Sequence, residues 1–411
     1  MSRQVMIVGG GASGLSAAIA AARAGAAVTI LERLPRVGKK LLLTGNGRCN
    51  LGHSGHDFSR YHGTLPQAKQ ILSRFDTEVF FQQLGLYTRT DDEGRMYPCS
   101  NAAASVLDAL RMEAARLGVT EITDCMVTDL QPQKNGAWLI LAGDAKYSAD
   151  AVILAAGGAA APACGTDGSL YPILKRLGHT IIPPMPALCP IPSDANFLRP
   201  LKGMRVRASV SAIAEGKVRG REVGEVQFTD TALSGICLFN LSRLAATEGG
   251  KLQISLDVLP ESWQSDADGG LSKLTELTQI RANAACGDLL TGLLPKRVAE
   301  VLVKQAVGTA GGTVAELLGT DNAKIKLLRL LNDWRFPVCG KAKFAQAQVT
   351  AGGIAGQCVD ASLASKIQKN LYFCGELLDV DGDCGGYNLD WAWASGAWAG
   401  HHAATSENKA R

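Results

Sequence analysis

The first residues that could do chemistry are the glycines of a short motif near the N-terminus. Gly9, Gly11 and Gly14 fit the pattern G-x-G-x-x-G, and an acidic residue, Glu32, follows them. Glycines at this spacing allow a tight turn and a close approach of the backbone to a pyrophosphate. A carboxylate at the position of Glu32 can accept hydrogen bonds from an adenosine ribose. These residues predict a dinucleotide-binding site and leave open whether the ligand is NAD or FAD.

Two strands and a helix must position these groups. The apolar run 5–8 has the length of a short buried strand, the alanine-rich stretch 15–25 favours a helix, and residues 28–31 form a second apolar run. The result is a βαβ unit whose helix N-terminus, with Ala12 and Ser13, offers N–H groups and the positive end of its dipole to phosphates.

Length and composition indicate a folded protein of two domains. The chain has 411 residues, of which 46% are hydrophobic and 19% charged, and its net charge is +4. No run of about 18 apolar residues occurs, and the first strand starts too early for a signal peptide, so we expect a cytoplasmic protein without a membrane segment. The 11 cysteines form no C-x-x-C pair and the six histidines have no zinc-site spacing, so no metal site is expected.

The predicted secondary structure changes after a proline-rich stretch. Four prolines lie between residues 183 and 190, short alternating strands fill 202–257, and helical patterns fill 270–333. We therefore predict a discontinuous dinucleotide-binding domain, residues 1–188 and 336–411. Residues 189–335 form an inserted domain with a β-barrel and helices.

A late segment favours FAD over NAD. The predicted strand at 370–376 ends in Gly375 and Glu376, and in flavoproteins with two dinucleotide-binding domains a late acid of this kind lies on the flavin ribitol. Gly386, Tyr387 and Asn388 then precede a predicted helix over 389–404. Its N-terminus could face the flavin and stabilise the anionic reduced form. The fold class is therefore α/β, with a Rossmann-like FAD domain of the two-dinucleotide-binding-domain type interrupted by the insert.

Motifs in order along nearly the whole chain carry a more specific resemblance. They are residues 38–40 with 44–50, 94–98 with 105–107, 186–188, 224–229 with 233–235, 334–337, and 375–379 with 385–396. The chain resembles the family of FAD flavoproteins that includes aminoacetone oxidase, the bile-acid dehydro-reductase of gut bacteria and bacterial flavoenzymes that form dihydrouridine in 23S ribosomal RNA. It departs from the family pattern at 157–165, where an expected aromatic residue is missing, and at Cys384. These departures leave the substrate open.

The resemblance implies a set of residues around the cofactor. These are Gly9, Gly11, Ala12, Ser13, Gly14, Glu32, Arg33, Lys40, Gly47, Arg48, Cys49, Asn50, Val127, Ala155, Gly157, Gly375, Glu376, Gly386, Tyr387 and Asn388. We expect the flavin ring between the 45–50 loop and the 385–388 turn.

Four of these residues are candidates for catalysis. Tyr387 and Asn388 are expected to line the flavin. Arg48 could face the flavin or an anionic substrate, or form a structural salt bridge. Cys49 could donate a proton to a substrate carbon, or be a buried inert thiol.

The expected activity is that of an FAD-dependent oxidoreductase that reduces an activated C=C bond, in a uracil of ribosomal RNA or in a small enone. A protein acid would deliver the proton, and NAD(P)H, bound transiently, would supply the electrons. The alternatives are an amine oxidase of the aminoacetone oxidase type that produces hydrogen peroxide, and a redox-sensing flavoprotein. The expected partner is a small molecule or ribosomal RNA, and the oligomeric state stays open.

Overall fold

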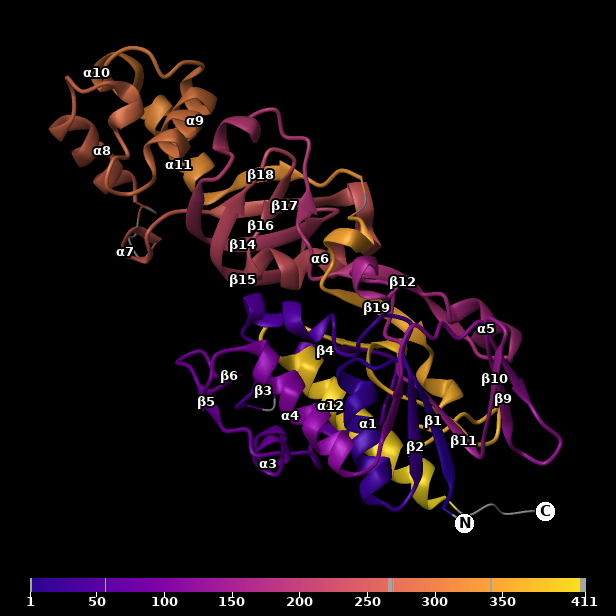
Figure 1. The fold of residues 1–411 in the computed structure, drawn as a ribbon. Coiled ribbons are helices and arrows are strands. Elements are labelled where there is room, and N and C mark those ends of the chain that lie inside the picture. The colour runs from indigo at the N-terminus through magenta and orange to yellow at the C-terminus, as the bar shows by residue number, and fades with distance from the viewer. Residues whose placement is uncertain (1, 56, 265–267, 269, 341, 407–411) are drawn as a thin grey trace. The chain divides into compact units, whose positions relative to one another are not determined.

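The computed structural model describes the chain except residues 1, 56, 265–267, 269, 341 and 407–411 (Figure 1). It divides into two compact units, residues 1–186 with 347–411, and residues 187–346. The sequence predicted domain boundaries after residues 188 and 335. In the structure the boundaries lie after residues 186 and 346. The second boundary lies later because residues 334–337 form a strand of the second unit.

A parallel sheet of five strands is the centre of the first unit. Its strand order is β20-β11-β1-β2-β7, and every neighbouring pair is parallel. The strands are β1 (Gln4–Val8), β2 (Ala27–Leu31), β7 (Thr120–Ile122), β11 (Ala151–Leu154) and β20 (Leu371–Phe373). The apolar runs predicted as strands at 5–8 and 28–31 are buried in this sheet except for the half-buried Thr29, and all of β11 is buried, as residues covered on both faces should be.

Two helices far apart in the sequence pack against each other in this unit, α1 (Ala12–Arg23) and α12 (Tyr387–Thr405) (Figure 1). Their contact is close because the facing residues are small. A side chain at Gly396 would come within 3.0 Å of Ser16, and the Ser16 hydroxyl donates a hydrogen bond of 2.7 Å to the Trp393 carbonyl. This packing brings the last helix of the chain beside the first.

Smaller elements complete the first unit. Short sheets are formed by β8 (Asp129–Pro132), β9 (Trp138–Ala142) and β10 (Ala145–Ala149); by β3 (Gly52–His53), β5 (Thr88–Thr90) and β6 (Arg95–Pro98); by β4 (Tyr61–Gly63) and β21 (Val380–Gly382); and by β12 (Ile181–Ala187) and β19 (Val349–Ile354). The remaining α-helices are α2 (Ala68–Leu72), α3 (Thr77–Gln82), α4 (Ala103–Arg116) and α5 (Tyr171–Arg176).

Local hydrogen bonding and sheet pairing divide two stretches of this unit. Residues 64–86 contain two short helices, because the Asp76 carboxylate accepts a hydrogen bond from the Val79 N–H and so begins α3 as a separate helix. Residues 119–130 contain β7 and β8, which belong to different sheets.

Antiparallel strands form a barrel in the second unit. The strand order is β13-β16-β15-β14-β17-β18. The elements are β13 (Ile191–Pro192), β14 (Arg205–Ala214), β15 (Lys217–Phe228), β16 (Ala232–Ser234), β17 (Leu252–Asp257) and β18 (Trp334–Pro337), with α6 (Ile236–Glu248) packed on β15. A β-bridge between Ser193 and Val338 joins the two edges, and the Cys339 N–H donates to the Pro192 carbonyl at 3.1 Å. The sheet therefore closes on itself. The predicted domain boundary after residue 335 falls inside β18, which completes the barrel.

Helices fill the rest of the second unit. They are α7 (Glu261–Gln264), α8 (Leu271–Ile280), α9 (Lys296–Val307), α10 (Val314–Leu318) and α11 (Asp321–Asn332). Thr313 and Glu316 form a capping box at the start of α10, and Thr320 caps α11. Among the described residues, no helix has the length and apolar character needed to cross a lipid bilayer.

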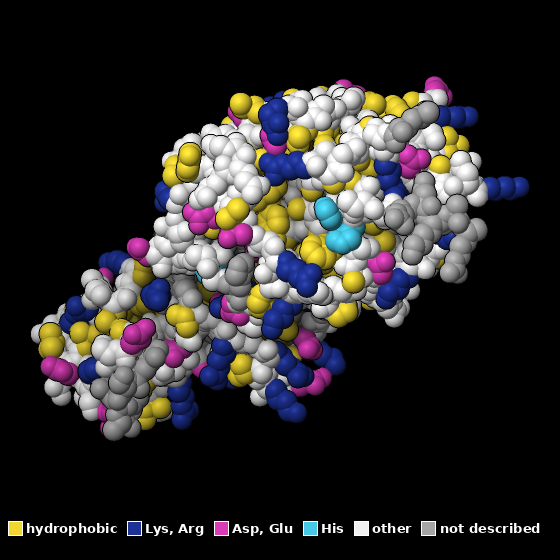
Figure 2. Space-filling model, turned by 90° about the horizontal axis from the view of Figure 1, so that it is seen from below, with side chains coloured by type: hydrophobic (Ala, Val, Ile, Leu, Met, Phe, Trp, Pro, Cys, Tyr) yellow, Lys and Arg dark blue, Asp and Glu magenta, His cyan; other side chains and the backbone are white. Residues whose placement is uncertain are grey.

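A groove of about 350 Å³ runs along α2 and α12 in the first unit. Its lining residues are Ile71, Arg74, Phe75, Ala394, Ala397, Trp398, His401 and His402. Histidine side chains lie beside hydrophobic ones on the face shown in Figure 2.

Candidate active site

The glycine turn between β1 and α1 has the geometry of a phosphate cradle. Gly9 has φ +103°, and a side chain there would come within 2.6 Å of the Ala155 carbonyl oxygen. At Gly11 a Cβ atom would meet no protein atom within 4 Å, so the backbone borders open space. The first N–H groups of α1, from Ala12 on, lack intrahelical acceptors, and no side chain caps them. These N–H groups can bind an anion.

Glu32, directly after β2, holds this turn in place. Its carboxylate is 8% exposed and accepts hydrogen bonds from the Gly10 N–H at 2.8 Å and the Leu34 N–H at 2.9 Å. Each carboxylate oxygen has a second lone pair, so the group can also accept from a sugar hydroxyl. The Cys125 N–H donates to the Glu32 carbonyl at 2.8 Å, which brings the segment containing the buried Val127 beside the end of β2.

Glu376 connects segments from both ends of the chain. One of its carboxylate oxygens lies 2.8 Å from the Lys40 ammonium group, and the other accepts from the Thr350 N–H at 2.9 Å. The preceding Gly375 has φ +67°, and a Cβ there would lie 2.5 Å from the Ser13 Oγ and 2.8 Å from its Cβ. The late acid therefore lies near the start of α1.

The segment after β11 borders the same carboxylate. A Cβ at Gly158 would lie 2.8 Å from a Glu376 oxygen, and the Thr350 hydroxyl accepts hydrogen bonds from the Ala159 and Ala160 N–H groups at 2.8 and 2.9 Å. Ala155 and Gly157, predicted to contact the cofactor, begin this segment. Close backbone approach explains its small residues.

Arg33 is fixed by the loop that contains residues 165 and 167, after β11. Its guanidinium group pairs with Asp167 at 2.8 Å and donates to the Gly165 carbonyl at 3.3 Å. Part of its hydrogen-bonding capacity is thus directed at protein groups.

The loop 44–50 has a strained backbone. Asn46 and Cys49 have φ values of +56° and +60°, which non-glycine residues rarely adopt, while Gly47 at +81° does so without strain. Protein atoms enclose the Cys49 side chain completely, and burial raises the pKa of this thiol to about 12. A protonated, enclosed thiol favours the inert interpretation over that of a proton donor.

Arg48 and Asn50 in the same loop have different surroundings. Among the described residues Arg48 has no carboxylate partner, so the salt-bridge interpretation finds no support. Its guanidinium carbon lies 4.7 Å from the centre of the Tyr97 ring. The Asn50 Oδ1 atom is buried next to Gly386, where a Cβ would come within 2.8 Å of it. The 45–50 loop therefore borders the 385–388 turn.

Asn388 is committed to the backbone of that turn. Its Oδ1 accepts from the Gly382 N–H at 2.9 Å, and its Nδ2 donates to the Gly382 and Asp383 carbonyl oxygens at 2.6 and 3.4 Å. We had expected Asn388 to offer a polar group at the reacting edge. The structure shows both ends of the amide engaged, so the side chain positions the turn.

Tyr387, the first residue of α12, is held by two rings. It stacks on His53 with a centroid distance of 5.1 Å and meets the edge of Tyr61 at 5.4 Å. Its hydroxyl group has no hydrogen-bond partner among the described residues. Burial raises the pKa of Tyr387, so the hydroxyl is protonated at neutral pH and can act as a donor.

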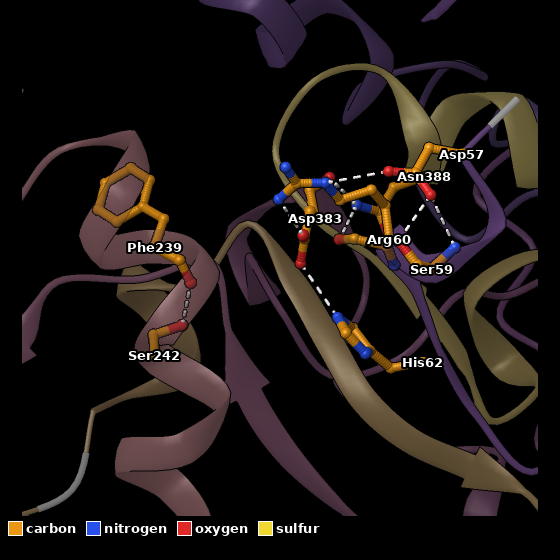
Figure 3. Close-up of polar contacts among 9 residues, drawn as sticks. Asp57, Ser59, Arg60, His62, Phe239, Ser242, Asp383 and Asn388 are labelled. Carbon is orange, nitrogen blue, oxygen red and sulfur yellow. Dashed lines mark hydrogen bonds and ion pairs between the residues drawn. The ribbon is translucent and has the colours of Figure 1, made fainter. Parts of the chain in front are cut away.

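Sequence reasoning missed a charged cluster around Asp383 (Figure 3). The buried Asp383 carboxylate lies 3.0 Å from His62 Nε2 and 3.1 Å from an Arg60 nitrogen, and its N–H donates to the Arg60 carbonyl at 3.0 Å. The pairing of β4 with β21 creates this contact. The only sign of it in the sequence is an aspartate two positions before the double glycine at 385–386. Figure 3 also shows the hydrogen bond from Ser242 to Phe239 inside α6 of the second unit.

These observations fit an FAD molecule. The backbone at Gly11 leaves open space where a pyrophosphate would approach, and uncapped N–H groups border it. Glu32 and Glu376 retain lone pairs for hydroxyl groups. In contrast, the described residues include no group of three or more His, Cys, Asp and Glu side chains able to hold a metal ion.

Comparison with known proteins identifies the family. A family model described as the HI0933-like protein Rossmann domain matches residues 3–402. The chain belongs to this family. It is 39% identical over 411 residues to the 3-dehydro-bile acid delta(4,6)-reductase of Clostridium scindens, covering 98% of this chain and 99% of the relative.

Two further relatives are ribosomal RNA dihydrouridine synthases. The protein from Escherichia coli is 28% identical, with 96% of each chain covered. That from Haemophilus influenzae is 25% identical, with 95% of this chain and 96% of the relative covered. The predicted family and the Rossmann-like FAD fold are thus confirmed, and the protein is an FAD-dependent oxidoreductase.

Proposed function

We propose that this protein reduces an activated carbon–carbon double bond in a small enone. The observation that carries the proposal is the 39% identity, over nearly the full length of both chains, to a bile-acid delta(4,6)-reductase. A reductase of that name saturates a double bond conjugated to a carbonyl group. The uncapped helix N-terminus and the open Gly11 backbone support a tightly bound FAD as the redox group.

The residues that would hold FAD follow from their positions. The Gly9–Gly14 turn would bind the pyrophosphate, Glu32 the adenosine ribose and Glu376 the ribitol, with Lys40 orienting the Glu376 carboxylate. The 45–50 loop and the 385–388 turn would border the flavin ring. Bound FAD supplies hydride transfer at this place.

Tyr387 is the proton donor in this proposal. Its ring is fixed between His53 and Tyr61, and its hydroxyl group makes no hydrogen bond to a described residue. Reduction of an enone needs a proton at the carbon next to the carbonyl group, and a neutral phenol can give it. The Asn388 amide, through its hydrogen bonds to the Gly382 backbone, stabilises the turn that precedes Tyr387.

Anaerobic rapid mixing of the FAD-loaded protein tests the proposal. We expect NADH or NADPH to bleach the flavin, and a 3-oxo-4-ene steroid to restore its colour faster than oxygen does. Bleaching by an amine followed by rapid peroxide formation would show an amine oxidase instead. Colour changes without any product would indicate a redox sensor. Either result contradicts the proposed reductase.

Uracil in ribosomal RNA is the second candidate substrate, because two relatives at 25 and 28% identity are named ribosomal RNA dihydrouridine synthases. Mass mapping of ribosomal RNA nucleosides from a strain that lacks this protein tests it. Loss of a dihydrouridine in that strain, restored by the gene, would favour RNA over a small enone.

A further inference from the structure

We propose that Arg48 and Arg89 form a binding subsite for an anionic group of the substrate, a carboxylate or a phosphate. Tyr97 is the platform that holds both arginines. The inference rests on the proposed function, because it specifies the substrate as a charged enone.

The two guanidinium groups gather on one aromatic ring. The Arg48 guanidinium carbon lies 4.7 Å from the centre of the Tyr97 ring, and that of Arg89 lies 5.5 Å from it. Arg89 in β5 is the direct cross-strand neighbour of Tyr97 in β6, so the sheet register fixes this contact. The two positive charges are thus at most about 10 Å apart, near one Debye length at 0.1 M salt, and they repel each other.

No carboxylate of the described residues neutralises the positive charges of Arg48 and Arg89. Among the described residues neither Arg48 nor Arg89 has a carboxylate within ion-pair distance, and Arg89 donates only to the neutral Asn101 amide at 2.9 Å. Arg95 of the same hairpin contrasts with them, since it pairs with Asp91 at 2.8 Å and Glu93 at 2.9 Å. Two acids of the hairpin turn, Asp91 and Glu93, therefore pair with Arg95. Guanidinium groups without such partners are suited to bidentate binding of carboxylate or phosphate.

The arginine pair is continuous with the candidate active site. A Cβ at Gly45 would lie 2.8 Å from the Asn50 N–H nitrogen and 3.5 Å from the Tyr97 ring, and Asn50 Oδ1 lies against Gly386, which precedes Tyr387. Positive φ values at Gly47 and Cys49, the two neighbours of Arg48, shape the backbone that presents this residue to the ring. A substrate whose reacting carbon lies at Tyr387 could therefore place an anionic group at Arg48 and Arg89.

A binding experiment with the FAD-loaded protein tests the subsite without turnover. The probes are a 3-oxo-4-ene steroid with a side-chain carboxylate, its methyl ester, and inorganic phosphate, each titrated calorimetrically. We expect the acid to bind about tenfold tighter than the ester, which corresponds to about 1.4 kcal/mol. Arg48→Gln and Arg89→Gln should each remove this preference and weaken phosphate binding, while leaving the ester affinity unchanged. Arg48→Lys, which keeps the charge, should retain part of the preference.

Arg74→Gln is the matched control. Arg74 also lies over an aromatic ring, 5.7 Å from the centre of Trp398, but on the α2–α12 groove. This variant should bind all three probes as the parent protein does. If Arg48→Gln and Arg89→Gln bind the acid and phosphate like the parent, the subsite is wrong. If neither steroid binds, but phosphate binds and is weakened in both variants, the subsite stands and the enone proposal fails. Absence of phosphate binding and of any acid preference in the parent overturns the subsite.

Discussion

The Lys40 ammonium group lies 2.8 Å from a carboxylate oxygen of Glu376, although 336 positions of sequence separate the two residues. The pair connects the basic stretch after β2 to the loop after β20. The Thr350 N–H binds the other carboxylate oxygen at 2.9 Å. The acid proposed to hold the ribitol is therefore oriented from two sides.

Breaking this pair should weaken FAD binding. Because both side chains are partly exposed, we expect their coupling in a double-mutant cycle to be only about 0.5–1 kcal/mol of unfolding free energy. Lys40→Met and Glu376→Gln should nevertheless each lower FAD affinity by about tenfold, since each loses a charge-assisted hydrogen bond that fixes the site. Fluorescence titration of the apoprotein with FAD measures this. Unchanged affinity in Glu376→Gln would show that the carboxylate does not contact the cofactor.

Substitution of Gly11 should separate cofactor binding from folding. A Cβ at this position meets no protein atom within 4 Å, so Gly11→Val should change the unfolding free energy of the apoprotein by less than about 0.5 kcal/mol. It should abolish FAD binding, because the side chain takes the space of the pyrophosphate. The ratio of FAD to protein after acid release measures occupancy. Gly250→Val, at another open glycine in the second unit, should keep full occupancy. A yellow Gly11→Val protein would refute the placement of the motif.

Tyr387→Phe should separate chemistry from binding. If its hydroxyl delivers the proton, removing it should lower the rate of enone reduction by about 10²-fold or more, with FAD occupancy unchanged. Burial raises the pKa of Tyr387, so this donor is protonated across the neutral range and the rate should fall only at alkaline pH. Pre-steady-state rates from pH 6 to 10 measure both effects. Equal rates in the two proteins would exclude Tyr387 as the donor.

Asn388→Leu should reduce stability as well as turnover. The change leaves the Gly382 N–H and carbonyl groups without their side-chain partner, and each unsatisfied buried group costs about 1–3 kcal/mol. Urea unfolding of the FAD-loaded protein measures the loss. If turnover fell with stability unchanged, Asn388 would act on the substrate directly, as the sequence had led us to expect.

Cys49→Ala should leave catalysis nearly unchanged. Burial raises the pKa of this thiol from 9.0 to about 12, so folding favours the protonated form. The thiol therefore contributes stability that is fully present below pH 9 and is lost as the pH rises toward 12. Unfolding free energies between pH 8 and 11 should decline less steeply in Cys49→Ala than in the parent. A loss of turnover at neutral pH would instead support the proton-donor role.

The sequence by itself determined the βαβ unit and, through its motifs, the family. Those features depend on local information, because a strand shows itself by an apolar run, a tight turn by glycine spacing and a helix by its composition. Glu32 could be named for the same reason, since it follows a strand at a fixed distance from the glycine turn.

Only the tertiary structure decided which side chains meet. The hydrogen bonds of Thr350 to Ala159 and Ala160, the contact of Asp383 with Arg60 and His62, and the bridge between Ser193 and Val338 that closes the barrel all join segments whose own sequences carry no sign of the partner. The same holds for Asn388, whose type predicted a polar contact but not the backbone atoms of Gly382 that receive it. Such contacts arise from the packing of whole strands and helices, which places polar groups within hydrogen-bond reach after the chain has folded.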